Sequence, residues 1–169
     1  MNTLLAPLQP EDWPAVRRIY QEGIDTRQAT FETAVPSWEE WDAGKLASCR
    51  IVARTDDKIV GWAALSPVSR REVYAGIAEV SVYVTEQARG HGLGKALLKK
   101  LIDCSERSGL WMLQALMFPE NEASVALHRI CGFRLVGKRE KIAKHYGVWR
   151  DTVLMERRSP IVGQVASSK

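Results

Sequence analysis

Three glycines lie within five residues in the segment ARGHGLGKALL, residues 88–98, and apolar residues at helical spacing follow them. The first backbone N–H groups of a helix have no partner within the helix and carry a partial positive charge. Glycines just before a helix let a ligand approach the backbone closely and permit positive φ. The segment therefore predicts a site for an anion such as a phosphate.

Two well-known phosphate motifs do not fit this segment. A Walker P-loop requires Ser or Thr after its lysine, but Ala96 follows Lys95. A Rossmann fingerprint requires G-x-G-x-x-G, and Gly90, Gly92 and Gly94 have a different spacing. From spacing alone, an ordinary glycine-rich turn before a helix is as good an interpretation as a phosphate site.

A carboxylate lies on the strand that we expect before the glycines. The segment IAEVSVYV, residues 77–84, alternates strictly, with its valines on one face and Glu79, Ser81 and Tyr83 on the other. Glu79 would face a substrate cleft and is a candidate general base. The alternative is a salt-bridged carboxylate on a half-exposed strand.

The composition is that of one globular domain over residues 1–169, with 46% apolar and 26% charged residues. The formal charge of +4 comes from scattered basic residues, so no nucleic-acid partner is indicated. No apolar stretch reaches the roughly 18 residues that span a bilayer, and no signal-peptide pattern starts the chain. We expect a cytoplasmic protein without a membrane partner.

The cysteines Cys49, Cys104 and Cys131 are odd in number and widely spaced. They predict free thiols that behave as small apolar side chains, with neither a disulfide framework nor a zinc or other metal site. No His–Asp arrangement beside a cysteine is evident from the sequence. Direct attack on a substrate is therefore favoured over an acyl-cysteine intermediate.

The remaining pattern predicts an α/β domain with a mixed sheet. Four helices are expected: at 9–22, after Ser37, from the glycine segment to Gly109, and at 122–131. The capping box SWEE marks the start of the second, and Gly109 and Gly132 end the last two. Strands are expected at 2–6, in a hairpin over 50–65, at 77–84, at 110–118 with both faces buried, and at 133–138 and 148–156. Residues 159–169 are expected to be a frayed tail.

Longer segments resemble one superfamily. VYVTEQARGHGLGKALL resembles the core motif of the GNAT superfamily of N-acetyltransferases, and ENEASVALHRICGF resembles its second motif. TFET at 30–33, REVYAGIAEVSVYV at 71–84 and HYGVWRDTVLME at 145–156 resemble the branch of phosphinothricin and methionine sulfoximine acetyltransferases. The resemblance covers most of residues 3–157.

This resemblance implies a fold and a co-substrate. The fold is a mixed sheet of about seven strands flanked by helices, with acetyl-CoA in a V-shaped gap between two central strands. The pantetheine arm would pair with the strand that ends Val82, Tyr83 and Val84. Asn121 would contact the pantetheine, or else it only caps the helix that it precedes. The pyrophosphate would lie on the glycine segment, whose residues are Arg89, Gly90, His91, Gly92, Leu93, Gly94 and Lys95.

The resemblance also implies an activity, the transfer of an acetyl group to the α-amine of a small amino acid or analogue such as phosphinothricin, methionine sulfoximine or methionine sulfone. Glu79 would act as base through one water. His128 stands where many members have a tyrosine that protonates the leaving thiolate, so it is a candidate general acid, or else a histidine packed beside the pantetheine. The alternatives are a protein or peptide N-acetyltransferase and a non-catalytic acyl-CoA-binding module.

By the same resemblance, Arg71 would hold the substrate carboxylate with help from Tyr74, or Arg70 would do so if the register slips by one residue. Phe31 and Glu32 would shape the roof of the pocket. A homodimer is implied, in which Trp149 and Asp151 approach the site across the interface. The alternative roles are core aromatics for Phe31 and Trp149 and a surface charge for Asp151.

Overall fold

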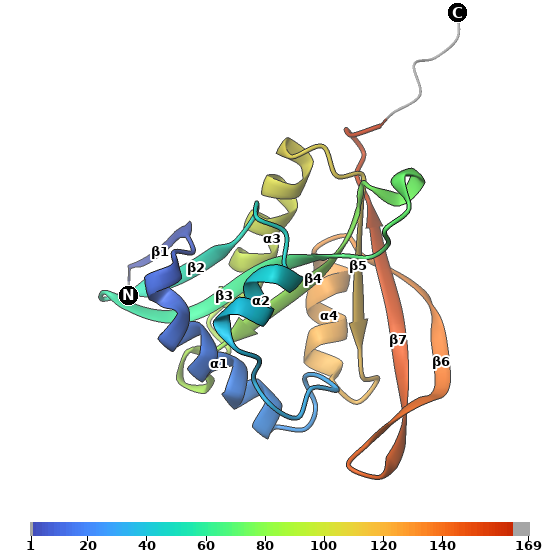
Figure 1. Cartoon of the computed structure of the whole chain (residues 1–169), viewed down its shortest axis with the longest axis horizontal. Helices are drawn as coiled ribbons and strands as arrows, with labels where there is room; N and C mark the ends of the chain where they lie inside the picture. Colours follow the sequence, from blue (N-terminus) through green and yellow to red (C-terminus); the bar gives the residue numbers. More distant parts are fainter. Residues whose placement is uncertain (1, 164–169) are drawn as a thin grey trace, which may run out of the picture.

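One seven-stranded sheet organises the protein. The structure is a computed structural model that describes residues 2–163, and the strand order is β1-β2-β3-β4-β5-β7-β6 (Figure 1). All neighbouring strands are antiparallel except β4 and β5, which are parallel. The strands are β1 (Thr3–Pro7), β2 (Ile51–Thr55), β3 (Lys58–Pro67), β4 (Ile77–Val84), β5 (Met112–Met117), β6 (Arg134–His145) and β7 (Val148–Arg158).

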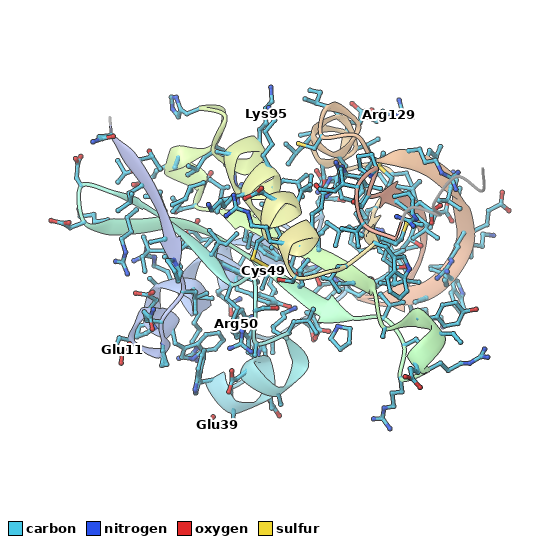
Figure 2. The ribbon with its side chains drawn as sticks, turned by 90° about the horizontal axis from the view of Figure 1, so that it is seen from above. Glu11, Glu39, Cys49, Arg50, Lys95 and Arg129 are labelled. Atoms are coloured by element: carbon cyan, nitrogen blue, oxygen red, sulfur yellow. A yellow bond between two sulfur atoms is a disulfide. The ribbon has the colours of Figure 1, made fainter. Side chains whose placement is uncertain are left out.

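Helices cover both faces of the sheet, and each face has its own core. On one face α1 (Trp13–Asp25) and α2 (Trp38–Gly44) pack on Trp62 and its neighbours. On the other, α3 (Leu93–Arg107) buries its leucines against β2–β5, with α4 (Glu122–Ile130) beside it. Figure 2 shows the two layers on opposite sides of the sheet. The described residues also contain three short 3₁₀ turns, η1 (Pro10–Asp12), η2 (Glu72–Tyr74) and η3 (Glu86–Ala88).

Local signals in the sequence place the start of α2 and the ends of α3 and α4 correctly, whereas the helix expected at 9–22 begins as η1 and continues as α1 to Asp25. The Ser37 hydroxyl accepts a hydrogen bond from the Glu40 N–H at 3.2 Å, and the Glu40 carboxylate accepts one from the Ser37 N–H at 3.0 Å. The predicted capping box is therefore confirmed. Gly109 and Gly132 follow α3 and α4 with φ of 82° and 90°, as helix-terminating glycines do.

The two central strands meet over a short length and then separate. β4 pairs with β5 only where Ile77–Glu79 faces Met112–Gln114. By contrast, β4 pairs with β3 over seven residue pairs and β5 pairs with β7 over six. Each central strand therefore follows its outer neighbour, and a V-shaped gap opens beyond Glu79, as the resemblance implies.

Strand β5 differs from the prediction of burial on both faces. Its residues alternate between buried and accessible, and Leu116 is 39% exposed. The accessible face borders the gap beside β4, so an apolar side chain there lines a hollow instead of a core. A nearly all-apolar segment cannot distinguish these two cases by periodicity.

The prediction of free thiols was wrong for two of the three cysteines. Cys49, just before β2, and Cys104, in α3, form a disulfide with a Cα–Cα distance of 5.6 Å. Cys131 is free and buried. The disulfide joins residues 55 apart in sequence, and it forms because α3 crosses the sheet at the start of β2, which no local spacing reveals.

Hydrogen bonds join the first residues after β7, where the sequence predicts a frayed tail, to the rest of the chain. Ser159 is buried, and its hydroxyl donates to a Glu106 carboxylate oxygen. Arg158 donates to the carbonyl oxygens of Val162 and Gly163. Residues 159–163 of the expected tail therefore make contacts with α3 and β7, and residues 164–169 lie outside the described residues. Among residues 2–163, no helix has the length and apolar character needed to cross a membrane.

The packing where β4 meets β5 predicts that a substitution of Gly76 lowers the stability of the protein. A Cβ atom added at Gly76 would lie 2.0 Å from the Trp111 ring, and the Gly76 carbonyl accepts hydrogen bonds from the N–H groups of Trp111 and Met112. We expect Gly76→Ala to lower the free energy of unfolding by about 1–3 kcal/mol through this overlap. Urea denaturation measures it.

The matched control is Gly137→Ala in β6, where an added Cβ would meet nothing within 4 Å. Its free energy of unfolding should stay within about 0.5 kcal/mol of the parent. Equal unfolding midpoints for Gly76→Ala and Gly137→Ala would contradict the packing described for the junction.

Candidate active site

A cavity of about 470 Å³ lies where β4 and β5 separate. Its walls come from β4 and β5, from the loop after α1, from the start of α4 and from β6. Glu79 and Ser81 reach it from β4, and Phe31 and Glu32 reach it from the loop. The predicted alternation of β4 is confirmed, because Val80 packs in the core under α3 while Glu79 faces the cavity.

Glu79 stands at the closed end of the gap. It belongs to the last residue pair between β4 and β5, opposite Gln114. The Gln114 side-chain amide donates a hydrogen bond of 3.0 Å to Glu79 Oε1. Gln114 therefore fixes the carboxylate and leaves its other oxygen available. Nothing in the sequence singled out Gln114, because its partner lies on another strand.

Aromatic side chains form one wall of the cavity. Tyr20 of α1 stacks on Tyr83 of β4 with ring centroids 4.9 Å apart, and Tyr83 stacks on Trp62 at 4.8 Å. Burial raises the pKa of Tyr20 to about 12 and also raises the pKa of Tyr83. Both hydroxyls therefore stay protonated at neutral pH. The Tyr83 side chain packs against α1, and its backbone lies on the edge of β4 that faces the gap.

Lys45 is a second residue that sequence analysis missed. It follows α2 and lines the cavity, where its ammonium donates to Ser66 Oγ at 3.0 Å and to Ser81 Oγ at 3.4 Å. Burial lowers the pKa of Lys45, and the nearby carboxylates of Glu79 and Glu32 oppose that shift. A lysine after a short helix carries no local signal of such a position.

His128 lies buried on α4 and lines the cavity. Its Nδ1 is 2.7 Å from the Ser124 carbonyl oxygen, so Nδ1 carries a proton and donates it there. Burial lowers the pKa of His128 and favours the neutral ring. The neutral ring then has no proton on Nε2, so this geometry favours an acceptor role over the general acid considered from the sequence.

The glycine segment forms an open turn at the start of α3. Gly90 and Gly92 have φ of 82° and 78°, and an added Cβ at either would meet nothing within 4 Å. Gly92 is the N-cap residue of α3, with no side chain to cover the free N–H groups of the first turn. Arg89 donates from Nε to the Val84 carbonyl at 3.2 Å and anchors the turn to β4. His91 and Lys95 are exposed beside it.

Asn121 caps α4 and borders the cavity. Its Oδ1 accepts from the Ser124 N–H at 3.3 Å, and its Nδ2 donates to the Gln28 carbonyl at 3.3 Å. The capping role is confirmed. Contact with pantetheine stays a prediction.

The structure separates the residues expected around the substrate into two groups. Phe31 lies edge-on to Phe118 with ring centroids 4.8 Å apart, and with Glu32 it borders the cavity. Arg71 and Tyr74 lie exposed on the η2 turn, outside the cavity lining, with the Arg71 guanidinium 5.4 Å from the Tyr74 ring centroid. Arg70 is exposed beside them.

Trp149 and Asp151 border a different hollow, at the end of the β6–β7 hairpin. Trp149 is 55% exposed. Asp151 accepts from the Lys141 N–H at 2.7 Å and faces Lys138, and these two groups lower the pKa of its carboxyl. Within residues 2–163, no group of three His, Cys, Asp or Glu side chains comes together in a way that could hold a metal ion.

Comparison with known proteins agrees with this geometry. The profile described as "Acetyltransferase (GNAT) family" matches residues 12–133. A phosphinothricin N-acetyltransferase from Alcaligenes faecalis is 34% identical over 157 residues, which is 89% of this chain and 79% of that protein. An L-methionine sulfoximine/L-methionine sulfone acetyltransferase from Pseudomonas paraeruginosa is 31% identical, over 86% of this chain and 88% of that protein.

A solved structure extends the match to three dimensions. The GNAT superfamily phosphinothricin acetyltransferase from Sinorhizobium meliloti, determined in complex with AcCoA, aligns with a TM-score of 0.85. It is 29% identical in sequence, and the alignment covers all of this chain and 93% of that one. The sheet with its V-shaped gap, the glycine turn before α3 and the matches in sequence lead to one conclusion: this chain is an acetyltransferase of the GNAT family.

Proposed function

We propose that the protein transfers the acetyl group of acetyl-CoA to the α-amine of a small amino acid or amino-acid analogue, with Glu79 as general base. The proposal is based mainly on one observation. The gap between β4 and β5 begins at Glu79 and opens into a cavity that the carboxylate faces. A thioester in the gap and an amine in the cavity would both reach Glu79.

The residues along the gap fit acetyl-CoA. Beyond Glu79, the edge of β4 at Val82–Val84 has no strand beside it on the β5 side, which leaves room for the pantetheine amides to pair with its backbone. The Val84 carbonyl is the exception, because it already accepts a hydrogen bond from Arg89. The glycine turn at 90–95 presents the N–H groups of the α3 N-terminus, with open space at Gly90 and Gly92 where side chains would otherwise stand. That arrangement suits a pyrophosphate. Acetyl-CoA supplies the activated thioester.

Glu79 has the chemistry that amide formation requires. An amino-acid amine is mostly protonated at neutral pH and must lose a proton to attack. Glu79, held by Gln114, accepts that proton through one water, and the amine nitrogen forms its bond to the acetyl carbon as the carbon–sulfur bond breaks. Coenzyme A leaves as a thiolate and takes up the second proton that the nitrogen loses. An acyl-cysteine is disfavoured because Cys49 and Cys104 are paired and burial raises the pKa of the Cys131 thiol.

The relatives and the size of the cavity support the proposed class of acceptor. Both curated relatives are named for small amino-acid-like substrates. A cavity of about 470 Å³ suits a ligand of that size. A peptide N-terminus is the second candidate, and an acyl-CoA-binding module without activity is the third.

We also propose a homodimer, assembled through the β6–β7 hairpin. Ile142, Tyr146, Val148 and Trp149 are between 43% and 61% exposed there. A second copy on this surface would cover them and bring Trp149 and Asp151 toward the neighbouring site. Exposed apolar clusters of this kind are typical of protein interfaces.

A thiol-release assay tests the proposed activity. The purified protein with acetyl-CoA should release free coenzyme A in the presence of phosphinothricin, methionine sulfoximine, methionine sulfone or a common amino acid, and not with peptides. Turnover with peptides alone would establish the second candidate. Tight acetyl-CoA binding with no turnover of any acceptor would establish the third.

A substitution of Gly92 tests the proposed phosphate site. Gly92→Val places a β-branched residue at φ 78° and a side chain over the free N–H groups of α3. We expect the affinity for acetyl-CoA to fall by roughly tenfold or more as backbone hydrogen bonds to phosphate are lost. Isothermal titration calorimetry measures it.

The matched control is Gly109→Val, which imposes the same strain at the other end of α3, where φ is 82° and the space is also open. It should lower stability similarly and leave the affinity unchanged. Equal affinities for Gly92→Val and Gly109→Val would refute the phosphate site.

Glu79→Gln tests the base. The glutamine carbonyl still accepts the hydrogen bond from Gln114, so the fold and the affinity for acetyl-CoA should be kept. We expect kcat to fall roughly 10²–10⁴-fold at neutral pH, and the loss to shrink as rising pH supplies free amine. A pH series of initial rates measures it, with the exposed Glu39→Gln on α2 as control. The same loss at every pH would indicate that Glu79 positions the substrate and does not remove its proton.

A further inference from the structure

Lys45 has no structural partner that accounts for its charge. None of the salt bridges among residues 2–163 includes it, and its two hydrogen bonds go to the neutral hydroxyls of Ser66 and Ser81. A partly buried ammonium with neutral partners is costly to maintain. An ammonium has three donors, so one remains for a ligand in the cavity that Lys45 lines.

The two hydroxyls place Lys45 close to Glu79. Ser66 on β3 is the register partner of Glu79, which puts their Cβ atoms about 5 Å apart. Ser81 is two residues further along the same face of β4, about 7 Å from Glu79. The ammonium that binds both hydroxyls therefore lies over this part of the sheet, and Glu79 and Glu32 lie near enough to raise the pKa of Lys45 against the effect of burial.

Opposite charges thus stand side by side in one cavity without forming a salt bridge. Glu79 is held by Gln114, and Lys45 is held by the two serines. A free amino acid is a zwitterion whose ammonium and carboxylate are one carbon apart. It can place its ammonium toward Glu79 and its carboxylate toward Lys45, whereas a peptide N-terminus has no carboxylate beside its amine.

We propose that Lys45 binds the α-carboxylate of the acceptor and thereby selects free amino acids. This inference rests on the proposed function. It assigns to Lys45 the role that the family resemblance gives to Arg71, which lies outside the cavity lining. Arg139, the other cation that borders the cavity, is exposed on β6.

The test compares two acceptors that differ only in the carboxylate, L-methionine sulfone and L-methionine sulfone amide. The parent protein should prefer the acid, with kcat/KM roughly 10- to 100-fold higher and the difference mainly in KM, as for a hydrogen bond to a charged group. Lys45→Met should lose that preference, and Lys45→Arg should restore part of it. The matched control is Lys58→Met at the exposed start of β3, which should behave as the parent.

Each result decides between assignments. If Lys45→Met keeps the parent's preference for the acid, the inference is overturned, and Arg71→Met then tests the alternative anchor. If the parent acetylates no amino acid while it binds acetyl-CoA, the proposed function fails first. If Lys45→Met loses the native circular dichroism spectrum, Lys45→Gln replaces it, because its amide still donates to the serines without a charge, and the same loss of preference is expected.

Discussion

Strands β4 and β5 are hydrogen-bonded over three residue pairs, Ile77–Glu79 against Met112–Gln114, and then diverge because each is paired more extensively with its outer neighbour. The sheet is in effect two smaller sheets, β1–β4 and β5–β7–β6, joined at this junction (Figure 1). The free edge of β4 and the cavity beyond it exist because the pairing stops. Gly76 permits the close contact at the junction, since any side chain there would overlap the Trp111 ring.

The chemistry of the site follows from that junction. Glu79 is the last paired residue of β4, so its carboxylate is fixed by Gln114 and still faces the open gap. Strand alternation then puts Ser81 on the same face, where it holds Lys45 with the help of Ser66. The glycine turn lies at the far end of β4, so one strand connects the proposed base to the proposed phosphate site. In the proposed complex, the length of β4 therefore sets the distance between the thioester end and the pyrophosphate of acetyl-CoA.

The sequence predicted what depends on near neighbours in the chain. The Ser37–Glu40 capping box, the glycines that end α3 and α4, and the face on which Glu79 lies all follow from spacings of a few residues. The features it missed join distant segments: the hydrogen bond from Gln114 to Glu79, the Cys49–Cys104 disulfide, and the position of Lys45. Burial of β5 on both faces was wrong for a related reason, because an apolar segment looks the same whether its second face meets a core or a ligand gap.

The proposed reaction requires the co-substrate and the acceptor to meet at Glu79, where β4 and β5 part. A crystal structure of the dead-end complex with coenzyme A and L-methionine sulfone tests it most directly. We expect the pantetheine along Val82–Val84, the thiol in the gap, and the acceptor nitrogen within one bridging water of the Glu79 carboxylate. A complex in which the gap is empty, or in which the acceptor nitrogen lies away from Glu79, would contradict it.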